Sequence, residues 1–568
     1  MSSQITPLQA DVRGDVRGDV RGDVRGEIFP VLTAEQISRI RSVSTLRKVK
    51  AGEILFEPGD SDVPVFVVLS GSLEIVQPDR RGERLIVKHE PGNFTGEMTV
   101  ISGRPALGRG RVTADGEFLE LSNEALRTLV ARDEELSEIF MRAFILRRVQ
   151  LINRGQGNVI LLGSQHSAKT LRLREFLTRN GHPYTNVDLD TDKSYQDLLD
   201  RFHVTVDQIP VVICNNRTVL RSPSIQELAR CLGLNAHITA AEVRDVVIVG
   251  AGPAGLAAAV YAASEGLDAL VIEADSPGGQ AGSSSKIENY LGFPMGISGQ
   301  ELAGRAAAQA QKFGAKVLIA NNVTKLDCEQ RPYELSVDCG HVIRARTVVI
   351  ASGAQYNKPN IDNLKKFEGQ GVYYGATYLE AQLCGDDEVI VVGGGNSAGQ
   401  AAVYLSQTAS KVHILVRAQQ LSETMSRYLI QRIDENPAIE MHYCTELVGM
   451  EGDSQLERVT WRDTKTGETS THDIRHVFIM AGASPRTGWL KDCVALDDKG
   501  FILTGRDLDP VLQDFKWPLS RVPQMLETSL PGVFAVGDVR AGNVKRVASA
   551  VGEGSISIYM VHRVLAEL

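Results

Sequence analysis

A glycine-rich turn directly after an apolar run, near the middle of the 568-residue chain, limits the possible folds more than any other feature. Residues 245–255 read Asp-Val-Val-Ile-Val-Gly-Ala-Gly-Pro-Ala-Gly, and an alanine-rich stretch follows as far as Glu265. Glycines let the backbone turn tightly and approach a pyrophosphate, while the first turn of a helix supplies free N–H groups. Glu273 ends the next apolar run, 23 residues after Gly250, where its carboxylate can accept hydrogen bonds from a ribose. This strand–helix–strand pattern predicts a dinucleotide-binding unit.

The same pattern occurs a second time further along the chain. Residues 388–398 read Glu-Val-Ile-Val-Val-Gly-Gly-Gly-Asn-Ser-Ala, and another apolar run ends at Val416. Val416 occupies the position of the acidic residue, and it is followed by Arg417, whose guanidinium attracts a ribose 2′-phosphate. We therefore expect the second site to prefer NADPH over NADH, with Arg427 as a second candidate for the phosphate contact.

Short motifs around the two glycine turns add a resemblance to a known family. They are Gly278-Gly279-Gln280, Ile287-Glu288-Asn289-Tyr290, Ala351-Ser352-Gly353-Ala354 and Gly532-Val533-Phe534-Ala535-Val536-Gly537-Asp538. Their order over residues 241–568 is similar to that of the low-molecular-weight thioredoxin reductases. The resemblance implies an FAD-binding domain formed by residues 241–360 and 484–568, with an NAD(P)-binding domain, residues 361–483, inserted between them.

The resemblance also implies roles for single residues. Asp538 is expected to bind the ribityl chain of FAD, and Arg546-Val547-Ala548 to lie near the pyrimidine edge of the flavin. The family has two adjacent arginines after the second strand, whereas here Arg417 is followed by Ala418. The expected cofactor-binding residues are Gly250, Ala251, Gly252, Pro253, Ala254, Gly255, Glu273, Gly279, Gln280, Asn289, Gly353, Gly537, Asp538, Arg546, Val547 and Ala548 for FAD, and Gly393, Gly395, Asn396, Ser397, Ala398, Arg417 and Arg427 for NADPH.

The redox-active cysteines of that family have no counterpart here. The family carries a Cys-x-x-Cys pair just before the second glycine turn, and this chain has Gly375 and Tyr378 at those positions. Its seven cysteines form no Cys-x-x-Cys pair, and we expect reduced, mostly structural thiols. Cys384 lies six residues after Tyr378, too far to replace the pair directly, and leaves single-thiol chemistry as a minor alternative.

Residues 27–155 are expected to form a small β-roll. Gly52-Glu53, Gly59-Asp60, residues 67–71 and Phe94-Thr95-Gly96-Glu97 resemble the cyclic nucleotide-binding domain, in which Gly96 and Glu97 would contact the ligand. The arginine that this family places after the cassette proline is replaced by Ala106. We expect a fold retained for docking or dimerisation, with weak or no cyclic nucleotide binding. Nucleotide binding with a substitute arginine is the alternative, and the candidates are Arg104, Arg109 and Arg111.

Residues 156–240 alternate between apolar runs and helical patterns, which predicts an α/β unit. It resembles thioredoxin or glutaredoxin, with Ile209-Pro210 at a bond that is usually cis in that family. Ser164 and Ser167 occupy the cysteine positions, and a hydroxyl cannot form a disulfide, so we expect a redox-silent adaptor. The expected elements are a strand at 159–162, a helix at 168–179, a strand at 184–189, a helix at 194–202 and a strand at 211–213.

The whole chain is therefore expected to be multidomain: a cyclic-nucleotide-binding-like β-roll, an α/β thioredoxin-like domain and two Rossmann-like three-layer nucleotide-binding domains. Residues 1–26 contain four Asp-Val-Arg-Gly repeats and are expected to be a disordered tail. The net charge of −9 argues against nucleic acid as a partner. We expect a cytoplasmic protein without a membrane span that assembles as a homodimer.

These patterns predict a flavoenzyme in which NADPH reduces FAD by hydride transfer. Since the cysteine pair is missing, the expected acceptor is a redox protein or small molecule such as ferredoxin, flavodoxin, a quinone or oxygen. A signalling flavoprotein with little turnover, whose β-roll senses a cyclic nucleotide or other effector, is one alternative. A thioredoxin-disulfide reductase that uses a non-standard thiol is another. No catalytic acid–base residue and no metal site are predicted from the sequence.

Overall fold

A computed structural model describes most of the chain. The described residues are 28–79, 82–96, 100, 105–153, 159–164, 167–190, 205, 208–214, 218–235, 242–422, 424–453, 455–490, 492–515 and 517–567. The expected tail at 1–26 and the expected helix at 194–202 lie outside these ranges. None of the helices within them combines the length and apolar character that a bilayer crossing requires.

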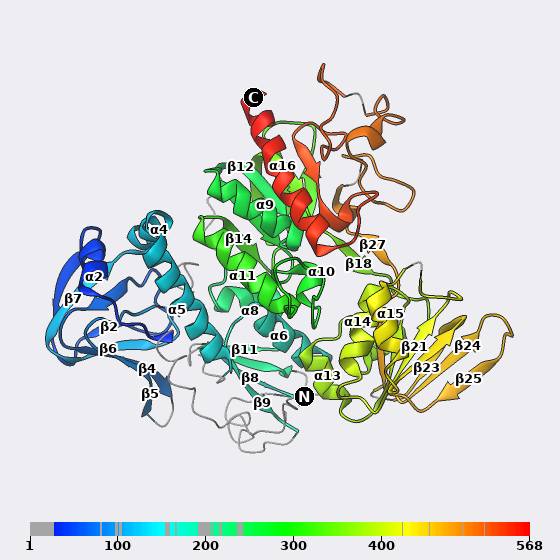
Figure 1. The fold of residues 1–568 in the computed structure, drawn as a ribbon, viewed down its shortest axis with the longest axis horizontal. Coiled ribbons are helices and arrows are strands. Elements are labelled where there is room, and N and C mark those ends of the chain that lie inside the picture. The colour runs from blue at the N-terminus through cyan, green and yellow to red at the C-terminus, as the bar shows by residue number, and fades with distance from the viewer. Residues whose placement is uncertain are drawn as a thin grey trace, which may run out of the picture.

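Residues 28–153, here called the roll unit, form two antiparallel sheets followed by two helices (Figure 1). The sheets have the strand orders β1-β7-β3 and β2-β6-β4-β5. Phe94, Phe140 and Phe144 pack together where the long helix α5 meets the strands, with ring centroids of Phe94 and Phe140 4.4 Å apart. The elements are α2 (Ala34–Arg41), β1 (Thr45–Val49), β2 (Ile54–Phe56), β3 (Val65–Val68), β4 (Ser72–Asp79), β5 (Gly82–His89), β6 (Arg109–Ala114), β7 (Gly116–Leu121), α4 (Asn123–Arg132) and α5 (Glu134–Asn153).

Residues 159–235, here called the bridging unit, form a four-stranded sheet of order β11-β10-β8-β9 with helices α6 and α8. The helix expected at 168–179 is present with those bounds, and the Ile209–Pro210 bond is cis, as expected. Strand β9 pairs with β8 in parallel, whereas β10 pairs with β8 antiparallel. The elements are β8 (Val159–Gly163), α6 (Ala168–Arg179), β9 (Thr185–Asp188), β10 (Val211–Cys214), β11 (Thr218–Arg221) and α8 (Ile225–Cys231).

The first glycine turn belongs to a unit formed by residues 242–356 and 483–567, here called the first-fingerprint unit. Its seven-stranded sheet has the order β14-β13-β12-β17-β16-β15, and β28 pairs with β17 in parallel, so the C-terminal segment returns to the sheet. Helix α16 packs along α9 (Figure 1). Its elements are β12 (Val243–Val249), α9 (Pro253–Ser264), β13 (Ala269–Glu273), α10 (Gly279–Gly282), α11 (Gly299–Lys312), β14 (Lys316–Ile319), β15 (Val323–Asp327), β16 (Tyr333–Val337), β17 (Val342–Ile350), β18 (Ala354–Tyr356), β27 (Ala483–Pro485), η3 (Gly488–Leu490), η4 (Gly505–Leu508), β28 (Val533–Ala535), η5 (Gly537–Val539) and α16 (Val547–Glu567).

The second glycine turn belongs to residues 358–482, here called the second-fingerprint unit. A parallel five-stranded sheet of order β19-β26-β20-β21-β22 carries helices α14 and α15, and an antiparallel sheet of strands β23 to β25 lies beside it. The chain enters and leaves this unit through β18 and β27, which pair with each other antiparallel. Its elements are α12 (Leu364–Phe367), β19 (Val372–Tyr373), α13 (Tyr378–Cys384), β20 (Glu388–Val392), α14 (Asn396–Leu405), β21 (Lys411–Val416), α15 (Arg427–Asp434), β22 (Ile439–Tyr443), β23 (Thr445–Glu451), β24 (Arg458–Asp463), β25 (Thr469–His472) and β26 (His476–Ile479).

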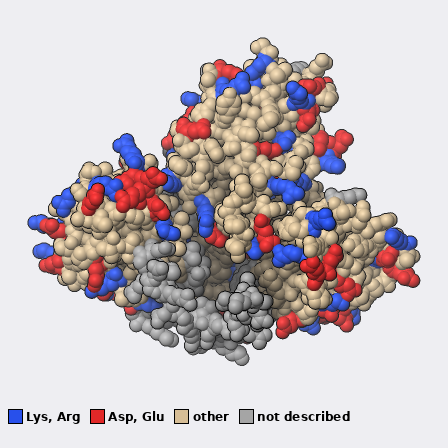
Figure 2. Space-filling view, in the orientation of Figure 1, with Lys and Arg blue, Asp and Glu red and all other residues tan. Residues whose placement is uncertain are grey.

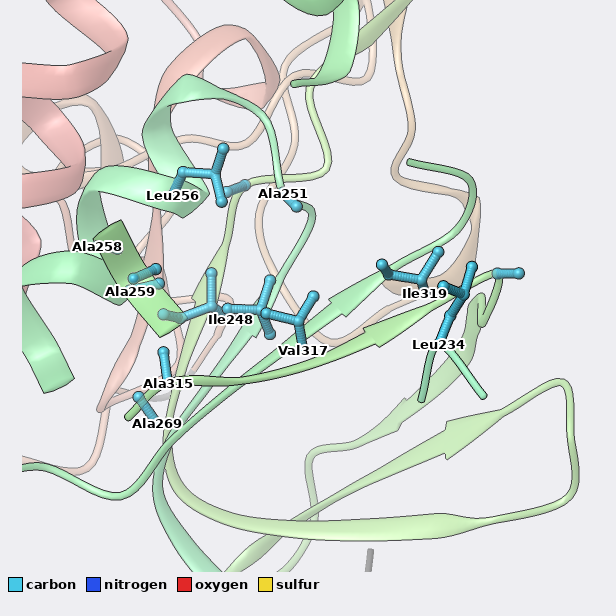
Figure 3. Close-up of a cluster of buried hydrophobic side chains, with 14 of the residues drawn as sticks. Leu234, Ile248, Ala251, Leu256, Ala258, Ala259, Ala269, Ala315, Val317 and Ile319 are labelled. Atoms are coloured by element: carbon cyan, nitrogen blue, oxygen red, sulfur yellow. The ribbon is translucent and has the colours of Figure 1, made fainter. Parts of the chain in front are cut away.

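The bridging unit is docked on its neighbours by side chains as well as by apolar packing. Figure 3 shows Leu234, at the end of the bridging unit, beside Ile319 in the core of the first-fingerprint unit. The side-chain oxygen of Asn235, in the bridging unit, accepts a hydrogen bond from the N–H of Ile319, in the first-fingerprint unit, at 2.7 Å. On the roll unit's side, Arg148 of α5 donates to the carbonyl oxygen of Gly181, just after α6, at 2.8 Å. Basic and acidic side chains are interspersed over the face drawn in Figure 2, without a large patch of one sign.

Two cysteines depart from the expectation of reduced thiols. Cys328 and Cys493 form a disulfide, and 165 residues separate them in the sequence. Cys328 follows β15 and Cys493 follows η3, so the bond joins the two chain segments of the first-fingerprint unit. The expectation was wrong for this pair because only the return of the C-terminal segment brings the two sulfur atoms together.

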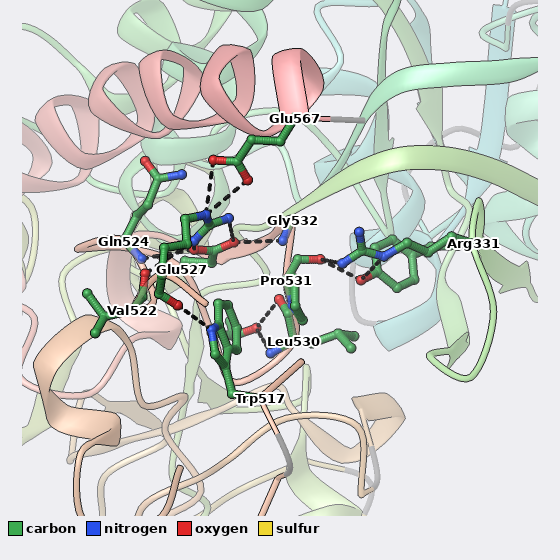
Figure 4. Close-up of polar contacts among 12 residues, drawn as sticks. Arg331, Trp517, Val522, Gln524, Glu527, Leu530, Pro531, Gly532 and Glu567 are labelled. Atoms are coloured by element: carbon green, nitrogen blue, oxygen red, sulfur yellow. Dashed lines mark hydrogen bonds and ion pairs between the residues drawn. The ribbon is translucent and has the colours of Figure 1, made fainter. Parts of the chain in front are cut away.

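A buried carboxylate holds the C-terminal segment in place (Figure 4). Glu527 is fully buried, forms an ion pair with Arg521 at 2.6 Å, and accepts hydrogen bonds from the N–H groups of Gly532 and Gln524 at 2.8 and 2.9 Å. Arg521 also pairs with the half-exposed Glu567 at 2.9 Å.

We predict that Glu527→Ala lowers the free energy of unfolding by about 3 kcal/mol, because the guanidinium and two buried N–H groups lose their acceptor. The matched change Glu567→Ala should cost about 1 kcal/mol or less, since that carboxylate is largely in solvent. Urea unfolding followed by tryptophan fluorescence, with Trp517 beside the pair, measures both. Equal losses for the two variants would contradict the prediction.

Candidate functional site

The first glycine turn is held against a neighbouring strand by contacts that leave no room for a side chain. Gly250 has a φ of +106°, and a Cβ added there would lie 2.3 Å from the carbonyl oxygen of Ala351. A Cβ on Gly255 would lie 1.9 Å from the carbonyl oxygen of Gly250. These two glycines therefore fix the turn at the carboxyl ends of β12 and β17, where the helix α9 begins.

Gly252, the middle glycine of the motif, instead has room for a Cβ. The nearest atom to an added Cβ is the Gly279 Cα at 3.9 Å, so the backbone is exposed on this side. Gly252 is the N-cap of α9 and makes no side-chain capping bond, which leaves the first N–H groups of the helix available to an anion. A cleft of about 700 Å³ opens here, a volume typical of sites for cofactor-sized ligands.

Glu273 lines this cleft at the end of β13. Its two carboxylate oxygens accept the N–H groups of Ala251 at 2.7 Å and Asp275 at 2.9 Å. Burial raises the pKa of the Glu273 carboxyl group above its ordinary value, although the two hydrogen bonds act in the opposite direction. The carboxylate is thus fixed beside the glycine turn, and each oxygen keeps a second lone pair for a ligand hydroxyl.

The C-terminal segment supplies the opposite side of the cleft. Asp538 follows β28 within η5, and burial raises the pKa of its carboxyl group. Its neighbour Gly537 donates its N–H to Glu553 of α16 at 2.7 Å, which fixes the turn against the helix. Lys545 and Arg546, directly before α16, are exposed and also line the cleft.

The cleft brings together most of the residues expected to bind FAD. Those that line it are Gly250, Gly252, Pro253, Ala254, Glu273, Gly279, Gln280, Asn289, Gly353, Gly537, Asp538, Arg546 and Val547. The expected residues Ala251, Gly255 and Ala548 do not line it: the first two support the turn, and Ala548 is exposed on α16.

One face of α6 in the bridging unit also lines the cleft, which was not expected from the sequence. Arg179 donates to the carbonyl oxygen of Gly279 at 3.0 Å and lies 3.6 Å from Asp275. Burial raises the pKa of the nearby Glu175 to about 6. The residues share one side of the helix at spacings of three and four, and they are Ala168, Leu171, Arg172, Glu175, Phe176 and Arg179. In the sequence, this amphipathic spacing indicates that the helix packs against something, but it does not identify the cleft as the surface that it contacts.

The segment before α13 reaches the same cleft. Gly375 lines it, and a Cβ added there would make an ordinary contact with Ser283 Cβ at 3.7 Å. Cys384 at the other end of α13 is buried, donates to the Glu380 carbonyl oxygen at 3.2 Å, and does not line the cleft. Burial raises the pKa of the Cys384 thiol to about 12, which disfavours the reactive thiolate.

The second glycine turn repeats the geometry of the first. Gly393 has a φ of +143°, and its Cβ would lie 2.6 Å from the Met480 carbonyl oxygen. Gly395 caps α14 without a side-chain bond, and the Asn396 side-chain oxygen accepts the Ser426 N–H at 2.8 Å.

Among the NADPH residues expected from the sequence, Asn396 and Ser397 line the large cleft, whereas Gly393, Gly395, Ala398, Arg417 and Arg427 do not. Arg417 and Arg427 are both exposed. Within the described ranges, the Arg417 guanidinium makes no ion pair or hydrogen bond, and it stays available to a ligand phosphate.

A second, smaller cavity lies inside the roll unit. Gly96 lines it, whereas Glu97 and Arg104 lie outside the described residues. Arg109 is paired with Glu57 at 2.9 Å and with Glu83, and Arg111 is paired with Glu74 and Glu83. Neither arginine lines the cavity, and the cavity lining is mainly apolar.

Comparisons with known proteins agree with this geometry. A family model described as "Pyridine nucleotide-disulphide oxidoreductase" matches residues 244–554, and one described as "Cyclic nucleotide-binding domain" matches residues 46–133. Thioredoxin reductase from Streptomyces clavuligerus is 34% identical over 328 residues, covering 58% of this chain and 95% of that protein. The Bacillus subtilis (strain 168) thioredoxin reductase is 33% identical over 328 residues, covering 58% and 96%.

Solved structures give the same result. Lactococcus lactis thioredoxin reductase in its FR conformation has a TM-score of 0.51 and 28% identity, covering 57% of this chain and 100% of that chain. The T. acidophilum enzyme has a TM-score of 0.50 and 30% identity, covering 56% and 98%. Because the first family model covers more than half of the chain, the chain belongs to the pyridine nucleotide-disulphide oxidoreductase family, as a thioredoxin-reductase-like flavin oxidoreductase preceded by a cyclic nucleotide-binding domain.

Proposed function

We propose that this enzyme binds FAD in the large cleft and NADPH at the second glycine turn, and that it passes electrons to an acceptor without a dithiol relay. The observation that carries the proposal is that the Gly250 turn and Glu273 meet Asp538, which lies 265 residues after Glu273 in the sequence, around one cleft of about 700 Å³. When bound, FAD supplies the hydride and electron chemistry that amino-acid side chains lack.

The chain's own residues bind and orient the two cofactors. The open N-terminus of α9 holds the pyrophosphate of FAD, Glu273 its adenosine ribose and Asp538 its ribityl chain. The equivalent N-terminus of α14 holds the pyrophosphate of NADPH, and the exposed Arg417 binds its 2′-phosphate.

The kind of electron acceptor is inferred from the lack of a cysteine pair at the cleft. Gly375 and Tyr378 stand where the thioredoxin reductases carry cysteines, and Cys384 is buried with a raised pKa. We infer an acceptor that takes electrons directly, such as an iron–sulfur protein, flavodoxin or quinone.

The bridging unit is proposed to be a thioredoxin-like domain that has become a structural cover. Ser164 donates to Asp190 at 2.7 Å, and Ser167 caps α6 by accepting the Thr170 N–H at 3.4 Å. Both hydroxyls therefore have structural partners, and α6 lies over the cleft mouth instead of carrying a redox pair.

We predict that Asp538→Ala lowers FAD affinity about tenfold or more, because the ribityl hydroxyls lose a charged acceptor. FAD per chain, from flavin absorbance after dialysis, measures the loss. The control Asp498→Ala, at an exposed carboxylate of the same segment, should retain wild-type FAD content. A colourless wild type that cannot be reconstituted with FAD would overturn the assignment of the cleft.

We predict that Arg417→Ala weakens NADPH binding about ten- to hundredfold and leaves NADH binding unchanged, because a charge-assisted bond to the 2′-phosphate contributes about 1.5–3 kcal/mol. Anaerobic titration of flavin bleaching with each nucleotide measures both constants. Lys465→Ala, on the exposed turn between β24 and β25, is the control. An NADPH constant that does not change in Arg417→Ala would disprove this contact.

We predict that the wild type reduces thioredoxin hardly above the rate without enzyme, and that Cys384→Ser does not change this. Direct acceptors such as ferricyanide or a quinone should give turnovers above about one per second. The double variant Gly375→Cys/Tyr378→Cys is the positive control for a restored dithiol, since Gly375 has room for a side chain. Rapid wild-type thioredoxin reduction that Cys384→Ser abolishes would show that this thiol acts as a relay.

A further inference from the structure

Three side chains with metal-ligating atoms meet on two neighbouring strands of the second-fingerprint unit. His413 of β21 is the register partner of Glu440 of β22, and His442 lies two residues further along β22. One ligand atom from each residue lies within 4.8 Å of the other two. His413 Nδ1 is 3.0 Å from His442 Nε2, and that nitrogen is 3.6 Å from a Glu440 oxygen.

A second carboxylate fixes the orientation of the His413 ring. His413 Nε2 lies 3.1 Å from Glu388 at the start of β20, and a neutral imidazole can bond to a carboxylate only through an N–H. The proton therefore sits on Nε2, and Nδ1 presents its lone pair toward His442. This carboxylate–histidine arrangement is the one that orients and strengthens histidine ligands in metal sites.

The three ligand atoms can be reached from solvent. The other oxygen of Glu440 pairs with Lys411, and among the described residues no Lys or Arg forms an ion pair with the oxygen that faces His442. The side chain of His413 is buried, that of His442 is 20% exposed and that of Glu440 is 45% exposed. The cluster thus has a fixed inner ligand and an open outer side through which an ion and a water ligand can pass.

We propose that His413 Nδ1, His442 Nε2 and the Glu440 carboxylate form a binding site for a divalent transition-metal ion, zinc in the first place. Bonds of about 2.0–2.2 Å in a tetrahedron place the ligand atoms about 3.3–3.6 Å apart. Two of the present separations, 3.0 and 3.6 Å, are close to this range, and the third is within 4.8 Å. On binding, His442 changes to the tautomer that carries its proton on Nδ1, so that Nε2 is free to ligate. Two imidazoles suit zinc, copper or nickel and disfavour magnesium, which prefers oxygen ligands.

The site is separate from the chemistry proposed above. None of the three residues is among those that line the large cleft, and the ion would join β21 to β22 beneath Trp461, whose ring centroid is 5.2 Å from that of His442. Its failure would leave the proposed function unaffected.

The test is isothermal titration of the full-length, untagged FAD-loaded protein with zinc chloride. We expect one ion per chain with a low-micromolar or tighter dissociation constant, and no comparable signal with magnesium chloride. His442→Gln and Glu440→Gln should each weaken binding at least tenfold, and Glu388→Gln should weaken it through the orientation of His413. His442 is partly exposed and Glu440 is nearly half-exposed, so both variants should fold, which circular dichroism checks.

His341→Gln, an exposed histidine of the first-fingerprint unit, is the matched control and should bind zinc as the wild type does. Wild-type binding weaker than about 100 µM would overturn the proposal. Equally, micromolar binding that persists in both His442→Gln and Glu440→Gln would assign the ion to another site, such as the free cysteines, and would also overturn it.

Discussion

The contact on which the large cleft depends is a backbone one: the turn at Gly250 lies against the carbonyl group of Ala351, with no space for a Cβ. This contact joins the end of β12 to the end of β17, and β17 in turn pairs with β28 of the C-terminal segment. That pairing brings Asp538 to the same cleft as Glu273, and the buried Glu527 stabilises the loop that leads into β28. The geometry of the proposed FAD site therefore follows from close backbone packing, and its polar side chains are positioned by that packing.

The sequence predicted those parts of the site that local pattern determines. The two glycine turns, the helix at 168–179 and the acidic end of β13 each depend on a short run of residues, and all are present. The Cys328–Cys493 disulfide, the approach of α6 to Gly279, and the His413–His442 cluster depend on which distant segments lie side by side. Strand register and domain docking decide these contacts, and neither can be predicted from the local spacing of residues.

The proposed function depends on two kinds of substitution that act together. At the cleft, Gly375 and Tyr378 are inferred to replace the cysteines of the family's redox pair. In the bridging unit, Ser164 and Ser167 have hydrogen-bond partners of their own. The remaining thiol nearby, Cys384, is buried and held as a thiol. On this proposal the scaffold of a disulfide reductase is retained, while Gly375, Tyr378, Ser164 and Ser167 leave both relay positions without sulfur.

The pairing of β18 with β27 has an architectural consequence. Tyr356 and Ala483 are direct partners in that ribbon, so the chain leaves the first-fingerprint unit and comes back to it within one strand spacing, about 4.8 Å. The 126 residues between them, 357–482, are in effect a cassette with adjacent ends. A tight two-residue turn would be enough to close the gap after excision, and a foreign nucleotide-binding module with similarly close termini could be spliced in at the same point. Replacing residues 357–482 could therefore change the nucleotide preference without altering the sheet of the first-fingerprint unit.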